Sequence, residues 1–114
     1  MRKEIFGLIL LVIIVSLTAC TSKYESHYNL GKWYYDKGLI DEAILEFKNA
    51  TKADMDNYQA HHSLAVAYTK KGWFKYALKE AEVAFDLYPA DKNYDLIQLI
   101  KQKFELEKKK NKSE

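Results

Sequence analysis

Residues 58–91 read YQAHHSLAVAYTKKGWFKYALKEAEVAFDLYPAD, and the 34 residues before them follow nearly the same pattern. Self-similarity at a fixed period of this size is the signature of stacked structural units, each of which buries its apolar face against a neighbour. The identical pairs that the offset brings together, with no gap, are Tyr24 and Tyr58, His27 and His61, Leu30 and Leu64, Tyr34 and Tyr68, Lys37 and Lys71, Gly38 and Gly72, Ala43 and Ala77, Glu46 and Glu80, and Ala50 and Ala84.

Each repeat predicts two amphipathic helices joined at a glycine. In residues 24–57 the first helix has apolar residues at i, i+3, i+4 and i+7, and Gly38 can end it in the left-handed conformation. In residues 58–91, Gly72 takes the same place, and Pro89 stops the second helix. The apolar faces are formed by His27, Leu30, Gly31, Tyr34, Ile40, Ala43, Ile44, Phe47 and Ala50, and by His61, Leu64, Ala65, Tyr68, Phe74, Ala77, Leu78, Ala81, Ala84 and Phe85.

These residues resemble the tetratricopeptide repeat, whose pattern is W-x2-L-G-x2-Y, then A-x3-F, then P, at this period. The first repeat departs from the pattern with His27 for tryptophan and Met55 for proline. The second departs with His61, Ala65 and Ala81. The matching residues are Leu30, Gly31, Tyr34, Ala43, Phe47 and Ala50 in the first repeat, and Leu64, Tyr68, Ala77, Ala84 and Pro89 in the second.

Residues 92–108 predict a single capping helix, followed by a polar tail at 109–114. Tyr94, Leu96, Ile97, Ile100 and Phe104 stand at helical spacing, and neither a glycine turn nor a second helix follows them. A terminal element of this kind covers the open apolar face of the preceding pair. The predicted fold is therefore all-α, a short solenoid of two helix-turn-helix repeats and a cap.

The first nineteen residues have the pattern of a secretory signal peptide. Arg2 and Lys3 supply positive charge, and the run from Ile5 to Leu17 is apolar but short for a permanent span. Residues 17–20, Leu-Thr-Ala-Cys, resemble a bacterial lipobox. An uncleaved anchor or a plain signal peptide with a chance cysteine are the alternatives.

The lipobox resemblance implies that Cys20 becomes the new N-terminus and carries lipid on its sulfur and its amine. Residues 20–23 would then form a short tether, which places the repeats next to a membrane. Thr21 is not the aspartate that commonly retains such proteins in the inner membrane. This favours an outer membrane, facing the periplasm, or the outer leaflet if the organism has one membrane.

The composition excludes several classes of function. The net charge of +2 is dispersed, with lysines clustered only at the end, so nucleic-acid binding is not indicated. That cluster is either a solvated end or a phosphate or headgroup contact. Cys20 is the only cysteine, which rules out an intramolecular disulfide.

Neither catalysis nor metal binding is indicated by the polar residues. Adjacent His61 and His62 point about 100° apart on a helix and cannot share an ion, and His27 repeats the place of His61. The acidic residues lie at turns and helix starts, where capping explains them. There is no nucleophile motif and no cofactor fingerprint, so we expect a protein that is not an enzyme and has no cofactor.

Resemblance to the repeat family implies a concave groove lined by the first helices. Some relatives clamp a C-terminal carboxylate there with lysine and asparagine, but Tyr28 and Lys32 hold those places here. The sequence therefore predicts an adaptor that binds an envelope protein or peptide. The expected groove residues are Tyr28, Lys32, Tyr35, Asp36, His62, Val66, Thr69, Lys70 and Ile100.

A self-associating lipoprotein with no dedicated groove is the alternative function. Two repeats are fewer than such arrays usually need for stability, so pairing between copies could supply the remainder. Trp33, Leu39 and Trp73 fit the apolar faces poorly, and each is either packed or part of an interface.

Overall fold

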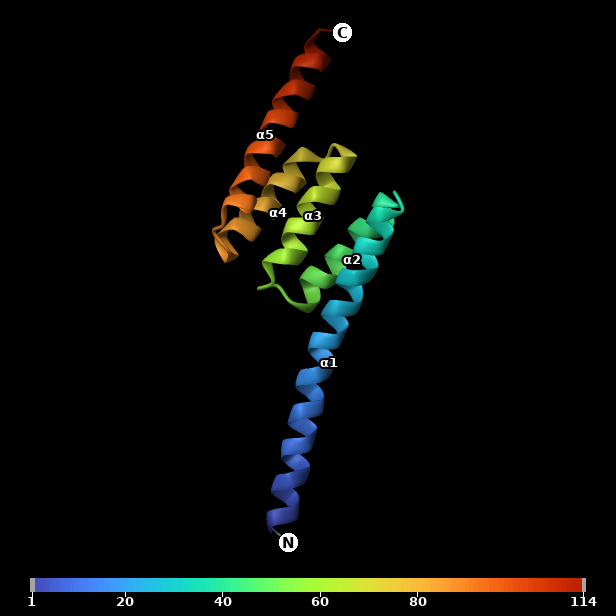
Figure 1. Cartoon of the computed structure of the whole chain (residues 1–114), viewed down its shortest axis with the longest axis vertical. Coiled ribbons are helices and arrows are strands. Elements are labelled where there is room, and N and C mark those ends of the chain that lie inside the picture. The colour runs from blue at the N-terminus through green and yellow to red at the C-terminus, as the bar shows by residue number, and fades with distance from the viewer. Residues whose placement is uncertain (1, 114) are drawn as a thin grey trace.

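Five helices follow one another in the computed structural model, which describes residues 2–113 without the side chains of residues 17–22. No strand occurs among these described residues, and the all-α prediction is confirmed. The molecule is a rod of 78 × 29 × 17 Å, with its termini at opposite ends (Figure 1). The helices are α1 (Arg2–Asp36), α2 (Ile40–Ala53), α3 (Tyr58–Lys71), α4 (Phe74–Leu87) and α5 (Asp91–Lys112).

The helices form two hairpins and a cap, in the order that the repeats predict. The second half of α1 packs against α2, α3 packs against α4, and α5 lies along α4 (Figure 1). The hairpins join through α2 and α3. One continuous core runs through all five helices, with fully or nearly buried residues that include Phe47, Leu64, Ala77 and Ile100.

The two glycine turns have the same geometry. Gly38 and Gly72 have φ of 77° and 76°, in the region where a side chain would be strained. Behind each glycine, the next N–H bonds back into the helix: Leu39 donates to Tyr34 O at 3.0 Å and Trp73 to Tyr68 O at 2.9 Å. Each bond adds a donor to a carbonyl in the last turn of the helix, which also accepts from Lys37 N in the first repeat and from Gly72 N in the second.

Gly31 lets α1 and α2 approach closely in the first repeat. A Cβ at this position would lie 2.6 Å from the Phe47 ring, well inside van der Waals contact. The second repeat has Ala65 at the equivalent place, and there Ala81 replaces the phenylalanine. The first repeat therefore fills this contact with a glycine and a large ring, whereas the second repeat has an alanine on each helix.

Helix α5 is the cap because its outer side is polar. If α5 were the first helix of a third repeat, its partner helix would pack on the positions equivalent to His61, Leu64 and Tyr68. Those positions, 34 residues later, hold Asp95, Gln98 and Gln102. All three of the latter residues are exposed, whereas their counterparts are buried. The helix continues to Lys112, four residues beyond the predicted cap boundary at 108.

Helix α1 runs without interruption from the apolar segment into the first repeat. The backbone of residues 20–23, where the sequence places a short tether, is helical. The side chain of Cys20 lies outside the described residues. Large apolar side chains from Ile5 to Val15 are exposed. Among the described residues, no helix contains an apolar stretch long enough to cross a membrane.

Candidate functional site

The first helix of each unit contributes to one groove, made of two adjoining clefts. The cleft between α1 and α3 has a volume of about 200 Å³ and is lined by Lys32, Tyr35, Asp36, Phe47, His62, Ser63 and Val66. The cleft between α3 and α5 has a volume of about 280 Å³ and is lined by Tyr35, Val66, Thr69, Lys70, Leu96, Leu99 and Lys103. Tyr35 and Val66 belong to both clefts, and we call the combined surface the groove.

Seven of the nine predicted site residues line the groove. They are Lys32, Tyr35, Asp36, His62, Val66, Thr69 and Lys70. Tyr28 lies at its edge: its ring stacks on Tyr24 at 5.7 Å between centroids and contacts the Phe47 ring at 6.1 Å. The Lys32 Nζ lies 5.6 Å from the centroid of the Tyr28 ring, so Tyr28 positions a groove lysine.

The prediction for Ile100 was wrong. Its side chain is 0% exposed and lies in the core beneath the groove, where a ligand has no access to it. The residues of the cap helix that line the groove are Leu96, Leu99 and Lys103. The error is one of helical phase, because adjacent residues on a helix differ by about 100° in direction.

His62 is held in place by Asn93, which sequence reasoning missed. The Asn93 amide nitrogen donates to Ala84 O at 3.2 Å and Tyr88 O at 2.7 Å, so its oxygen is left to accept. His62 Nδ1 donates to that oxygen at 2.8 Å, which fixes the imidazole and leaves Nε2 for a ligand. An asparagine within the apolar face of the cap, one turn before Ile97, was the available signal.

The groove combines an apolar floor with more positive than negative charge. Lys32, Lys70 and Lys103 line it together with one carboxylate, that of Asp36. The Thr69 hydroxyl donates to Ala65 O at 2.7 Å, which leaves it only as an acceptor toward a ligand. The floor of Tyr35, Val66 and Leu99 can bury an apolar side chain, and the lysines can pair with carboxylates.

The two repeat-equivalent histidines lie outside the groove and serve the fold. His27 Nδ1 lies 2.6 Å from Glu46 Oε2, and His61 Nδ1 lies 2.7 Å from Glu80 Oε2. Each pair joins the two helices of one hairpin at the same relative position. Across the side chains that are described, no three metal-ligating groups come together.

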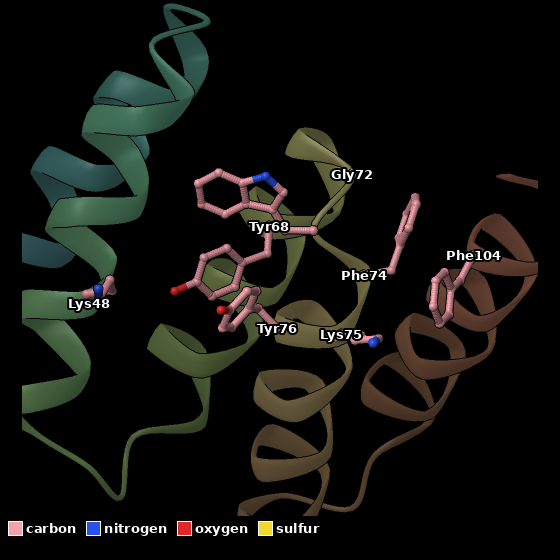
Figure 2. Close-up of a pocket in the computed structure, with 8 residues that line it drawn as sticks. Lys48, Tyr68, Gly72, Phe74, Lys75, Tyr76 and Phe104 are labelled. Atoms are coloured by element: carbon pink, nitrogen blue, oxygen red, sulfur yellow. The ribbon is translucent and has the colours of Figure 1, made fainter. Parts of the chain in front are cut away.

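A larger cavity, of about 600 Å³, lies away from the groove and was not anticipated. Its lining includes Tyr68, Trp73 and Tyr76, and Figure 2 shows Tyr68 and Tyr76 between the helix of Lys48 and that of Phe74. The Trp73 ring lies 5.9 Å from that of Tyr68, yet Trp73 remains 47% exposed. Trp73 therefore packs against Tyr68 with one part of its ring and exposes the other part to solvent. From the sequence alone, packing and an interface are alternatives for this residue.

Comparison with known proteins identifies the helical unit. Residues 31–72, from the first repeat helix to the turn after α3, match a family model described as TPR repeat. The order of the five helices is consistent with an all-α tetratricopeptide-repeat solenoid. No curated protein matches the chain. Tetratricopeptide repeats generally mediate binding between proteins.

Proposed function

We propose that this protein is a lipid-anchored adaptor of the bacterial cell envelope, which holds a protein or peptide partner in the groove. The observation that carries the proposal is the convergence of Tyr35, Val66 and Lys70 with their neighbours in two adjoining clefts of a tetratricopeptide solenoid. Groove binding is the mode in which aromatic side chains provide contact area and lysines set orientation.

The chemistry of the groove favours an amphipathic partner. Its apolar floor accepts one stripe of a helix or alternate side chains of an extended strand. Three lysines against one aspartate favour carboxylates beside that stripe. A partner with this character occupies both clefts at once, since Tyr35 and Val66 lie in each.

The anchor rests on the sequence from Leu17 to Cys20 and on the basic and apolar residues before it. Two or more acyl chains hold a protein stably on a bilayer, whereas one does not. If the membrane is that of a diderm organism, the outer membrane facing the periplasm is favoured. The partner is then a protein that lies at, or reaches, the same surface.

Mass spectrometry of the protein purified from bacterial membranes tests the anchor. We expect a chain that begins at Cys20 with the added mass of a diacylglycerol and an acyl group. The mass of the unmodified 114-residue chain would contradict the lipid anchor and leave the groove unaffected.

Affinity capture from membrane extracts tests the groove. Tyr28→Ala, Tyr35→Ala and Lys70→Ala should each reduce recovery of the partner, with Tyr35→Ala the strongest because it lies in both clefts. Tyr94→Ala and Lys101→Ala, exposed and outside the groove, are the matched controls. Equal recovery with all five variants would contradict a role for the groove.

Self-association is a second candidate, supported by the uncovered side of α1. Leu30 and Trp33 are 40% and 52% exposed, whereas their repeat equivalents Leu64 and Ala67 are 2% and 0% exposed. Another copy could cover them. Sedimentation of the delipidated protein discriminates, because a monomer at tens of micromolar would remove this candidate.

A further inference from the structure

We propose that the aromatic cavity around Trp73 is a second binding site, separate from the groove, for an acidic peptide segment with an aromatic or aliphatic side chain. We call this cavity the aromatic cleft. Its lining residues are Lys48, Tyr68, Gly72, Trp73, Phe74, Lys75, Tyr76 and Phe104. None of them lines either cleft of the groove, so two partners could bind at once.

The aromatic cleft lies between the second helices of the two hairpins. Lys48 comes from α2 and Tyr76 from α4, and these two helices do not pack on each other in the described part of the chain. Tyr68, near the end of α3, forms the floor between them and is 8% exposed (Figure 2). Phe74 extends the apolar surface to Phe104 on α5, with ring centroids 5.7 Å apart.

The fold does not require the two most exposed rings. Positions 34 residues before Trp73 and Tyr76 hold Leu39 and Glu42, and the first repeat forms the same glycine turn and hairpin with those residues. Trp73 is 47% exposed and Tyr76 is 63% exposed, so neither gains full burial from its place. Large aromatic side chains left in this state are typical of binding surfaces.

The rings are already ordered against one another. The ring centroids of Tyr68 and Tyr76 lie 5.7 Å apart, and those of Trp73 and Tyr76 lie 6.4 Å apart. Lys71 Nζ lies 5.6 Å from the centroid of the Trp73 ring, and it is fixed by an ion pair with Asp41 at 2.9 Å. A ligand therefore meets a surface that loses little side-chain freedom on binding.

The positive charge that lines the aromatic cleft favours an acidic partner. Lys48 and Lys75 are the only charged residues that line the aromatic cleft, and neither forms an ion pair with any described residue. Of the carboxylates nearby, Asp41 is paired with Lys71 and Glu80 with His61. Glu107 lies at the edge formed by Gly72, where a Cβ of that glycine would be 4.0 Å from Glu107 Oε1. A carboxylate-bearing peptide complements these two lysines, whereas a basic segment would be repelled.

Selection from a displayed random peptide library against the full chain in detergent tests the proposal. The Trp33→Phe variant leaves Trp73 as the sole tryptophan, so its emission reports binding directly. We expect enriched peptides that combine aspartate or glutamate with an aromatic or aliphatic residue, and that shift the Trp73 emission. Replacing their carboxylates by amides should weaken binding about tenfold.

The variant Trp73→Leu/Tyr76→Glu removes the two exposed rings. It places in the second repeat the residue types that the first repeat has at the equivalent positions, Leu39 and Glu42. It should keep the helical signal and cooperative melting of the parent and bind the peptides about thirtyfold more weakly. Lys48→Glu should weaken binding about three- to tenfold. Tyr35→Ala, in the groove, should leave it unchanged, so failure of the groove proposal is distinguishable from failure of this one.

Three results would overturn the inference: no enriched peptide, enriched peptides without acidic residues, or undiminished binding to Trp73→Leu/Tyr76→Glu. A glycan oligosaccharide is the competing ligand, because sugar rings also stack on tryptophan and tyrosine. If such an oligosaccharide shifts the Trp73 emission and Lys48→Glu does not weaken it, the aromatic cleft recognises carbohydrate and the peptide proposal is wrong.

Discussion

His61 is placed between two groups that accept hydrogen bonds. Its Nδ1 lies 2.7 Å from Glu80 Oε2, and its Nε2 lies 2.9 Å from Met55 O. A neutral imidazole has one donor and one acceptor nitrogen, so it would turn a lone pair toward one of these oxygens. The contacts are best satisfied by the imidazolium. The hydrogen bond to Glu80 accordingly raises the pKa of His61, against the opposing effect of its burial.

The stability of the protein should depend on pH through His61. Because the pKa of His61 is raised in the folded state, its contribution to stability is complete below the unfolded value of about 6.5 and is lost as pH rises through the folded value. The free energy of unfolding, from urea titrations, should therefore fall with pH above about 6.5. Glu80→Gln should flatten this decline, and the exposed Glu82→Gln should not. Identical pH profiles for all three proteins would contradict the assignment.

A second prediction concerns the close contact of Gly31 with Phe47. Gly31→Ala should destabilise the protein by about 1–2 kcal/mol, because overpacking against the ring outweighs the better helix propensity of alanine. In the Phe47→Ala background the same change should be neutral or stabilising by up to about 1 kcal/mol. A double-mutant cycle of unfolding free energies measures this reversal. An equal cost in both backgrounds would show that the ring does not cause it.

Among the elements, α5 depends on one polar side chain as well as on its apolar stripe. Asn93 is fully buried and links the end of α4 to His62 on α3. Its amide is a second donor to the Ala84 and Tyr88 carbonyls, which also accept from Tyr88 N and Ala90 N. The cap is therefore fastened to both helices of the second hairpin.

Asn93→Ala should lower the free energy of unfolding by about 1–3 kcal/mol, because the buried hydrogen bonds of its side chain to Ala84 O, Tyr88 O and His62 are lost. It should also free the His62 ring, which NMR of the imidazole protons would detect as loss of a fixed orientation. The exposed Asn111→Ala is the control and should change stability by less than about 0.5 kcal/mol. A cost for Asn93→Ala no larger than that of the control would contradict its role.

Periodicity predicted the elements well because each helix buries one face. The turns at Gly38 and Gly72, the two hairpins and the cap follow from spacing and from residues that suit a left-handed turn. The groove followed from resemblance to the repeat family, but Ile100 was assigned to the wrong side of its helix. The aromatic cleft was missed because Lys48, Tyr68 and Tyr76 come from three helices, and only packing brings them together.

At the scale of the whole molecule, the repeats pack only from about Lys23 onward. The end of α2 comes back beside Lys23 and His27, and the apolar residues from Ile5 to Val15 are exposed. The repeats and the cap therefore form one cooperative body, and the first part of α1 extends beyond it (Figure 1).

Removal of residues 1–19 should change the free energy of unfolding by less than about 0.5 kcal/mol, because the deleted part lies outside the core. Chemical denaturation of the two forms measures this, with equal m-values expected. Because it is produced without the signal sequence, the shortened protein carries no lipid on Cys20 and should not bind lipid vesicles. A large loss of stability would show that the apolar segment supports the repeats.

Because α1 is one unbroken helix, the direction in which the groove faces depends on the number of helical residues that precede it. Every residue inserted between Cys20 and Tyr24 would turn the groove by about 100° around the α1 axis and move it about 1.5 Å farther from residue 20. One added alanine would direct the groove sideways, whereas seven would return it nearly to its first bearing, about 10 Å farther out. The number of residues between Cys20 and the first repeat would then determine the direction in which the groove, and any partner bound in it, faces.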